Sequence, residues 1–135
     1  MSVQLNHTIV WCHDKQRSAG FLTDLLGLPP ATSFGPFLVV ELGNGVSLDF
    51  HAIDGKVASQ HYAFLVSEAE FDQVLGRIRG RDLAYWADPA QQRPREINHN
   101  DGGRGVYFED HDGHLLEIIT RPYGSATGDL PTRAP

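Results

Sequence analysis

Two histidines lie in apolar, strand-like segments, where a polar side chain needs a specific partner. His7 lies between Leu5 and Ile9 in a run of alternating residues, and His61 precedes Ala63 in a similar run. Alternate residues of a strand share one face, so each imidazole is expected to project from a mostly apolar surface. A single histidine in such a place is usually a hydrogen-bonded core residue, but two at related positions are less easily explained that way.

Glu117 lies in the run HLLEIIT, with apolar neighbours on both strand faces. A buried carboxylate pays a desolvation cost unless it is paired, protonated or bound to a cation. One alternative is a salt bridge to Arg95 or Arg104. The other is a metal, because two imidazoles and one carboxylate suit Fe(II), Mn(II), Ni(II), Co(II) or Zn(II) and leave positions open for substrate or water. We therefore predict that His7, His61 and Glu117 bind one divalent metal ion.

Asp49 is a further candidate, as an optional fourth ligand or a proton acceptor. Its strand also carries Ser47 and His51 on the same face, and this alternation equally describes a strand with one face in water. Candidates for orienting a substrate, on position alone, are Tyr62, Tyr107 and Arg95. Histidines next to acidic or glycine residues in predicted turns, where a surface role is favoured, are His13, His111 and His114.

The elements that would carry these residues begin with a βαβββ order in the first half of the chain. Asp14 begins a predicted helix with apolar residues at helical spacing, and Gly27 ends it. The sequence Gly-Asn-Gly at 43–45 is a strong hairpin signal. Strands are expected near residues 3–10, 31–33, 37–42 and 46–52.

The second half repeats this order. Ser67 and Glu70 form a predicted capping box that begins a helix with one apolar face. Strands are expected near residues 61–66, 96–98, 105–108 and 115–120. Beyond Arg121 the chain is rich in glycine, proline, serine and threonine, so little fixed structure is expected there.

An internal repeat relates the candidate ligands to one another. NHTIVWCHD aligns with QHYAFLVSE, which makes His7 and His61 equivalent, and NGVSLDF aligns with DGHLLEI, which makes Asp49 and Glu117 equivalent. The offset is 54 residues for the histidines and 68 for the acids, so 14 extra residues fall within the second module, in the region 87–103. If a pseudo-twofold axis relates the modules, the first strands bring both histidines and Glu117 toward one point.

Composition narrows the function classes. The 135 residues are enough for one core, and the single cysteine, Cys12, permits no internal disulfide. We find no signal-like start and no apolar run long enough to span a membrane, so a cytoplasmic protein is expected. The net charge of -6 and the absence of a dense basic block argue against nucleic-acid binding.

Three motifs together resemble the vicinal oxygen chelate (VOC) superfamily, over roughly residues 3–121. LNHTIV and QHYAFLV match the two metal-histidine strands, and GRGVYFEDHDGHLLEIIT matches the last hairpin with its glutamate ligand. This superfamily includes glyoxalase I, fosfomycin-resistance thiol transferases, methylmalonyl-CoA epimerase, extradiol dioxygenases and metal-free bleomycin-binding proteins.

The resemblance implies an α+β fold in which two βαβββ modules, 3–53 and 59–121, form a glyoxalase-like curved mixed sheet around a metal cavity, with helices outside. They would make one domain, 1–123, followed by a flexible tail, 124–135, and a homodimer is expected. The metal, on His7, His61 and Glu117, would act as a Lewis acid on a small substrate with neighbouring oxygens. Asp49 falls where glyoxalase I has a fourth, carboxylate ligand, but it is one methylene shorter. His111 stands where members often have proline, a change expected to affect only the turn.

Three functions remain open at this point. The first is a metal-dependent isomerase, lyase or thiol-transfer enzyme, with Glu117, Asp49 and Tyr107 as catalytic candidates. The second is an Fe(II) extradiol-type dioxygenase, for which the same ligands form a facial triad. The third is a metal-free protein that sequesters a drug or metabolite, against which the retention of all three ligand types argues. No glutathione-binding pattern is evident, so glyoxalase I activity itself is not predicted.

Overall fold

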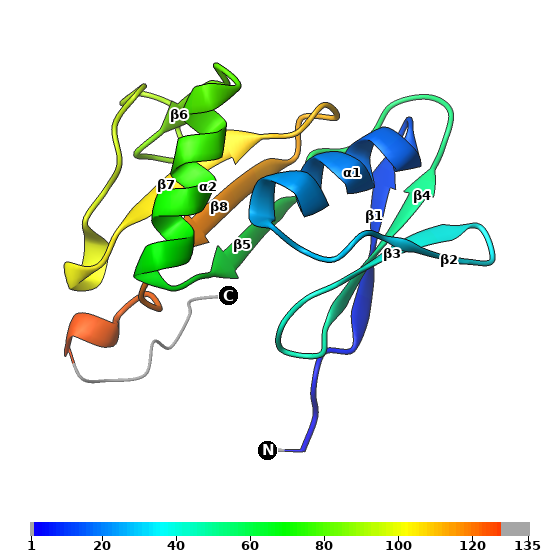
Figure 1. Cartoon of the computed structure of the whole chain (residues 1–135), viewed down its shortest axis with the longest axis horizontal. Coiled ribbons are helices and arrows are strands. Elements are labelled where there is room, and N and C mark those ends of the chain that lie inside the picture. Colours follow the sequence, from blue (N-terminus) through cyan, green and yellow to red (C-terminus); the bar gives the residue numbers. More distant parts are fainter. Residues whose placement is uncertain (1, 128–135) are drawn as a thin grey trace. The chain divides into compact units, whose positions relative to one another are not determined.

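Two four-stranded mixed sheets, each accompanied by one α-helix, form the regular structure of the chain (Figure 1). The computed structural model describes residues 2–127. The chain divides into two units. The first comprises the chain up to Ser59 together with Asp110–Asp112, and the second comprises Gln60–Glu109 and the chain from Gly113 onward. The α+β class and the two βαβββ repeats predicted from the sequence are confirmed.

The first unit holds one helix and four strands in the predicted order. Its elements are β1 (His7–Cys12), α1 (Lys15–Leu26), β2 (Thr32–Phe34), β3 (Phe37–Glu41) and β4 (Ser47–Ala52). The sheet order is β1-β4-β3-β2, in which only the β1–β4 pair is parallel. As predicted, Asp14 caps α1 by accepting a hydrogen bond from the Arg17 N–H, and Gly27 ends the helix in the left-handed region at φ 69°.

The register separates the two faces of this first sheet. Val10 lies opposite Phe50, and both are buried together with Leu22 and Leu25 of α1, so this face and the helix share the core. Residues one position along the strands point the other way. That face therefore carries His7, Ile9, Asp49 and neighbouring side chains.

The second unit repeats the arrangement with short 3-10 turns added. Its elements are β5 (His61–Leu65), α2 (Glu68–Gly80), β6 (Tyr85–Trp86), η1 (Asn100–Gly102), β7 (Gly105–Glu109), β8 (Leu115–Ile119) and η2 (Ser125–Thr127). The sheet order is β5-β8-β7-β6, again with a parallel first pair. The predicted capping box is present, with reciprocal hydrogen bonds between Ser67 and Glu70.

One face of the second sheet belongs to the core, and the other carries the polar residues of interest. Val106 lies opposite Ile118, and both are fully buried, as are Phe71 and Ile78 of α2. Glu117 is the residue before Ile118 on β8, so its side chain points to the opposite face of the sheet. The apolar face of α2 is therefore covered, and the sheet presents Glu117 on its other side.

The pairing registers confirm the internal repeat. Asp49 lies opposite Ile9 in the β1–β4 pair, two residues beyond His7. Glu117 lies opposite Ala63 in the β5–β8 pair, two residues beyond His61. The two histidines and the two acids thus occupy the same positions in their own sheets.

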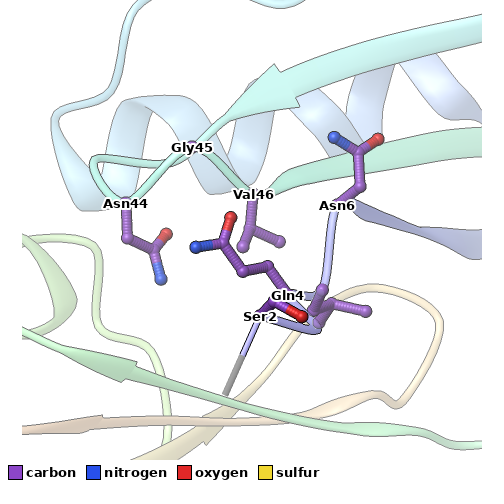
Figure 2. Close-up of a pocket in the computed structure, with 7 residues that line it drawn as sticks. Ser2, Gln4, Asn6, Asn44, Gly45 and Val46 are labelled. Atoms are coloured by element: carbon purple, nitrogen blue, oxygen red, sulfur yellow. The ribbon is translucent and has the colours of Figure 1, made fainter.

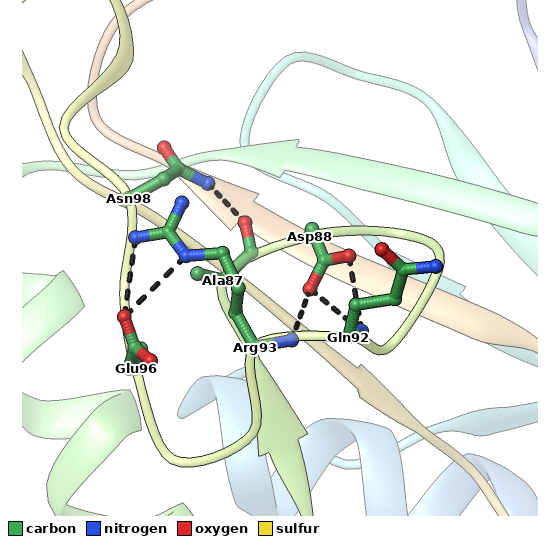
Figure 3. A network of polar contacts seen from close by, with 6 residues as sticks. All are labelled: Ala87, Asp88, Gln92, Arg93, Glu96 and Asn98. Carbon is green, nitrogen blue, oxygen red and sulfur yellow. Dashed lines mark hydrogen bonds and ion pairs between the residues drawn. The ribbon is translucent and has the colours of Figure 1, made fainter.

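The extra residues of the second module form a loop held by its own polar contacts (Figure 3). The Asp88 carboxylate accepts hydrogen bonds from the backbone N–H groups of Gln92 and Arg93, and Arg93 pairs with Glu96. Buried Asn98 donates its side-chain amide to the Ala87 carbonyl at 2.8 Å. These bonds satisfy the backbone of a long connection without regular structure.

The strand expected near residues 96–98 is wrong. The paired strand of the second sheet is instead β6, and Asn98 contributes only an isolated bridge to Gly105. Pro94 lacks a backbone donor, and Arg95 has a left-handed φ of 61°, so a regular ladder cannot run through this segment. In the first unit the predicted short strand at 31–33 is present one residue further along, as β2.

The start of the C-terminal tail has more structure than the sequence led us to expect. Residues Ser125–Thr127 form the 3-10 turn η2, and the Gly124 N–H donates to Asp101 at 3.0 Å. The rest of the predicted tail, 128–135, lies outside the described residues. None of the described helices combines the length and the apolar character needed to cross a bilayer.

Candidate functional site

His61 and Glu117 meet on the open face of the second sheet. His61 begins β5, and Glu117 lies in the middle of β8, the parallel neighbour of that strand. Ala63, two residues after His61, is the residue paired with Glu117. The imidazole of His61 spans this offset of two residues to meet the carboxylate. The His61 Nε2 atom lies 3.2 Å from the Glu117 Oε1 atom.

The hydrogen bond on the other side of the imidazole decides which nitrogen faces the glutamate. The His61 Nδ1–H donates to the backbone carbonyl of Leu115 at 2.9 Å. In a neutral ring Nε2 then carries the lone pair, and it faces a carboxylate oxygen. Two acceptors at this distance repel unless a cation lies at them, either a proton on the imidazole or a metal ion. An imidazole nitrogen and a carboxylate oxygen are a donor set that divalent transition metals prefer, so this pair fits a metal.

Glu117 is fully buried, and its second oxygen also has a partner. The Tyr123 hydroxyl donates to Oε2, and the Tyr107 and Tyr123 hydroxyl oxygens lie 2.8 Å apart. Burial of an isolated carboxylate costs several kcal/mol, roughly, even after relaxation of the surroundings. The phenol hydrogen bond offsets part of that cost, and the His61 side leaves room for a positive charge to offset more.

Burial also acts on the two phenols. It raises the pKa of Tyr107 to about 12, with the nearby Glu117 charge acting in the same direction. The pKa of Tyr123 is raised further, again by burial and by its hydrogen bond to Glu117. Both phenols therefore keep their protons near neutral pH and are available as hydrogen-bond donors.

A pocket of about 410 Å³ opens beside this group. It is lined by His61, Ala63, Leu65, Glu117, Ile119, Pro122 and Tyr123. Apart from the three polar groups its wall is apolar, which is typical of sites that hold a small organic molecule and orient it with few polar contacts.

The first unit carries a related pocket, of about 490 Å³, on the equivalent face of its sheet. His7 and Asp49 both line it. The His7 Nδ1–H donates to the side-chain carbonyl of Asn6 at 2.7 Å, which again leaves Nε2 as the nitrogen with the lone pair. Asp49 is partly buried and accepts a hydrogen bond from the Ser47 hydroxyl at 2.9 Å.

A third pocket, of about 660 Å³, lies at the N-terminal end of the same sheet (Figure 2). Figure 2 shows the amide side chains of Gln4 and Asn44 in it, next to the hairpin residues Gly45 and Val46. Asn6 lines both this pocket and the one that contains His7.

Within residues 2–127, no group of three or more histidine, cysteine, aspartate or glutamate side chains is arranged to hold a metal ion. His7 belongs to the first unit, whereas His61 and Glu117 belong to the second. The three-ligand site therefore stays a prediction, of which the structure brings two members together. Asp49, like His7, lies in the first unit.

Arg104, one of the two arginines considered as a salt-bridge partner of Glu117, pairs with other carboxylates. That guanidinium pairs with Glu68 and Asp72 of α2, at 2.8 Å in both cases, and lies over the Phe71 ring. The partners of Glu117 among the described residues are His61 and the phenols.

Among the other candidates, Tyr107 lies at the site, with its ring centre 6.1 Å from that of His61. Tyr62 is one position along β5 from His61 and so points to the opposite face, where its ring contacts His114. The surface role predicted for His114 is wrong, because this histidine is fully buried and its Nδ1 accepts a hydrogen bond from the Gln60 N–H.

Tyr123 was not among the site residues predicted from the sequence, because it lies in the segment expected to lack fixed structure. The one available signal was an aromatic residue six positions after Glu117, in an otherwise small and polar stretch. Only folding shows that the chain turns back after β8 and delivers this hydroxyl to the glutamate.

Comparisons with known proteins bear on the family and the fold. No protein-family model matches the chain. The solved structure of oxidase ChaP-H2 is similar, with 63% identity and a TM-score of 0.91 over 93% of this chain and 99% of that one. Glutathione transferase FosA of Serratia marcescens is 30% identical over 124 residues, 87% of this chain and 81% of that protein. Metallothiol transferase FosB of Lysinibacillus sphaericus (strain C3-41) is 29% identical over 126 residues, 89% of this chain and 84% of that protein.

The FosA match extends over most of both chains, and the two βαβββ units carry the histidines and the glutamate at repeat-related positions. The fosfomycin-resistance thiol transferases are one branch of the group that the three sequence motifs resemble. The chain belongs to the vicinal oxygen chelate superfamily.

Proposed function

We propose that this chain is a metal-dependent oxidase acting on a small molecule with neighbouring oxygen atoms. The observation that carries the proposal is the 63% identity to oxidase ChaP-H2 over almost the whole of that chain, about twice the identity to the thiol transferases. An oxidase uses oxygen, like the dioxygenase that was the second function predicted from the sequence, whereas the first was an isomerase, lyase or thiol-transfer enzyme.

The proposed metal ligands are His7, His61 and Glu117. What supports them is the hydrogen bond at Nδ1 of each histidine, which leaves the lone pair of each neutral ring on Nε2, and the buried carboxylate 3.2 Å from Nε2 of His61. A divalent metal bound there would supply Lewis acidity toward substrate oxygens and, as Fe(II), electrons for oxygen. Three protein ligands would leave positions for a substrate that binds through two oxygens.

The remaining residues of the pocket bind and orient. Leu65, Ile119 and Pro122 offer an apolar wall for the carbon skeleton of a substrate. Tyr107 and Tyr123, which keep their protons near neutral pH, hold Glu117 in place. Catalytic roles for Tyr107 and Asp49 remain part of the proposal, with Tyr107 as a group that orients the substrate and Asp49 as one that orients a water or accepts a proton.

Thiol transfer is the second candidate, because FosA and FosB align with nearly the whole chain. The two reactions consume different co-reactants. An oxidase moves two electrons and two protons from the substrate to oxygen, giving hydrogen peroxide, and a dioxygenase places both oxygen atoms in the product. A thiol transferase consumes one thiol for each electrophile and no oxygen.

The test is to purify the protein without added metal, measure bound metals by elemental analysis, and load it anaerobically with Fe(II) or Mn(II). Oxygen uptake is then followed with catechols, diols and ketoaldehydes, and thiol loss with glutathione and an epoxide. Uptake that requires metal and disappears in Glu117→Gln supports the oxidase. Thiol loss without oxygen uptake would transfer the proposal to the second candidate. Absence of metal binding would favour the metal-free sequestering function.

A homodimer is also part of the proposal, since each module alone has a small core. Light scattering at micromolar concentration tests it, and a monomer there would remove the dimer without affecting the proposed reaction.

A further inference from the structure

The two oxygens of Glu117 have different neighbours. Oε1 lies 3.2 Å from His61 Nε2, whereas Oε2 accepts the hydrogen bond of the Tyr123 hydroxyl. The Tyr107 hydroxyl, on β7, lies within hydrogen-bond distance of the Tyr123 hydroxyl, at 2.8 Å. The carboxylate is therefore held in one rotational position, with one oxygen toward the histidine and the other toward the phenols.

Tyr123 comes from a segment with few apolar anchors, which we call the strap, residues 122–127. Its position depends on a second set of bonds. Asp101 accepts the Gly124 N–H at Oδ2 (3.0 Å) and the Ala126 N–H at Oδ1 (3.4 Å). Arg121 adds a hydrogen bond to the Ser125 carbonyl at 3.4 Å.

The backbone of Asp101 is itself unusual, with φ 57° in the left-handed region. Aspartate and asparagine tolerate this conformation better than other residues with a Cβ. The next residue, Gly102, also has a positive φ of 76° and lies against the Arg121 side chain. The turn thus presents the Asp101 carboxylate to the strap, and both of its oxygens are used there.

We propose that Tyr123 is a positioning residue for the metal centre: its hydroxyl holds Oε2 of Glu117, so that Oε1 alone is presented beside His61, and Asp101 seats the strap that carries it. This inference rests on the proposed metal site. It assigns to the C-terminal segment a role in keeping one coordination position free for substrate, because a carboxylate that binds through both oxygens occupies two positions.

The prediction differs from that for a merely structural tyrosine. Loss of a structural hydroxyl lowers stability and leaves the metal environment unchanged. Loss of a positioning hydroxyl would instead leave Oε2 without its hydrogen bond, and a metal held by Glu117 would then be expected to gain a second oxygen ligand. Partners of this kind, which hold a ligand without touching the metal, typically alter metal affinity about 10- to 100-fold.

The experiment uses the full chain loaded with Co(II), whose visible absorption weakens as its coordination number rises. Tyr123→Phe should lower the visible intensity severalfold and change Co(II) affinity about tenfold. Asp101→Asn keeps the left-handed turn but removes one acceptor, and it should shift the spectrum in the same direction by less. The double variant should resemble Tyr123→Phe. Tyr85→Phe is the matched control, because it removes the hydroxyl of a buried tyrosine that accepts a hydrogen bond from Arg79 in the same unit, and Tyr85 does not line the pocket.

Melting temperature and circular dichroism establish that each variant is folded. An unchanged Co(II) spectrum and affinity in folded Tyr123→Phe would overturn the inference while leaving the metal centre standing. An unchanged spectrum in Asp101→Asn alone would remove the strap's seat from it. If wild-type protein takes up no Co(II), Fe(II) or Mn(II), the proposed function fails and this inference falls with it.

Discussion

Asp49 and Glu117 occupy equivalent positions in the two sheets but lie in different surroundings. Each lies level with the residue two places beyond its histidine on the neighbouring parallel strand. Glu117 is fully buried between His61 and Tyr123, whereas Asp49 is only partly buried and is bonded to Ser47. The repeat therefore provides one carboxylate in each sheet. Because Glu117 is more deeply buried than Asp49, its charge needs a neighbouring cation more strongly.

Replacement of Glu117 by glutamine should weaken metal binding by at least about 100-fold while leaving the fold intact. The amide keeps the shape of the side chain and can still accept from Tyr123, but it lacks the charge that balances a cation. Isothermal titration with Mn(II) or Co(II) measures the change, and His7→Ala and His61→Ala should show the same loss. Glu109→Gln, an exposed change two residues after Tyr107, is the control. Full metal occupancy in Glu117→Gln would remove this residue from the ligand set.

Asp49→Ala should reduce metal affinity far less than Glu117→Gln does. The aspartate is one methylene shorter than glutamate, and carboxylate ligands bind metals at about 2.0 to 2.2 Å, so lost reach of over about 1 Å prevents coordination. Activity should still fall if Asp49 orients a water or accepts a proton from the substrate. Parallel titrations and oxygen-uptake assays separate these effects. A fall in affinity as large as in the Glu117 variant would make Asp49 a true ligand.

The Cys12 thiol should be nearly inert in the folded protein. Burial, with the nearby Asp112 carboxylate, raises its pKa from 9.0 to about 11. At pH 8 the thiolate fraction is then on the order of one in a thousand, so Ellman's reagent should react only slowly. Reaction in guanidinium chloride gives the full count of one thiol.

The same pKa shift has a consequence for stability. Because the folded pKa lies above the unfolded one, the stability associated with the neutral thiol is complete below pH 9 and is lost as pH rises through about 11. Cys12→Ala should therefore flatten the loss of melting temperature between these two values. An equally steep loss in Cys12→Ala would show that other groups cause it.

Ser67→Ala should destabilise the second unit by about 1 kcal/mol, because it removes the hydroxyl that caps α2. Urea unfolding measures the change.

Glu70, the other half of the capping box, has its pKa held below the ordinary value of 4.5 by hydrogen bonds from Ser67. Its stabilising contribution is thus present above pH 4.5 and is lost as pH falls below it.

Glu70→Gln should accordingly be more stable relative to wild type at pH 3 than at pH 7. The amide still accepts the Ser67 N–H, but it has no charge to interact with the N-terminal end of the helix dipole. At pH 7 the wild-type carboxylate has that attraction and the variant lacks it, whereas at pH 3 more of the wild-type side chain is protonated and the difference shrinks. Glu109→Gln, an exposed change outside α2 and the capping box, is a comparison variant. A pH-independent difference between Glu70→Gln and wild type would contradict this account.

Local sequence patterns determined the elements and the pairing of the repeat. Asp14 and Gly27 bound the first helix, the Ser67–Glu70 box begins the second, and the equivalence of His7 with His61 follows from a simple alignment. The helix signals lie within a few residues of the helix ends, where backbone propensity and capping dominate, and the repeat is visible because each of its aligned segments is continuous in the sequence. The buried setting of Glu117 was readable for the same reason, since apolar residues flank it on both faces.

Tertiary structure alone decided which groups meet that carboxylate. The His61 contact requires the β5–β8 register, and the Tyr123 contact requires a turn seated on Asp101, more than twenty residues earlier in the chain. Likewise, the fourth strand of the second sheet is β6 and not residues 96–98, because pairing partners are chosen across the sheet once Pro94 and Arg95 have broken the local ladder. Contacts between residues far apart in sequence depend on the packing of the whole unit, so no short window of the sequence contains them.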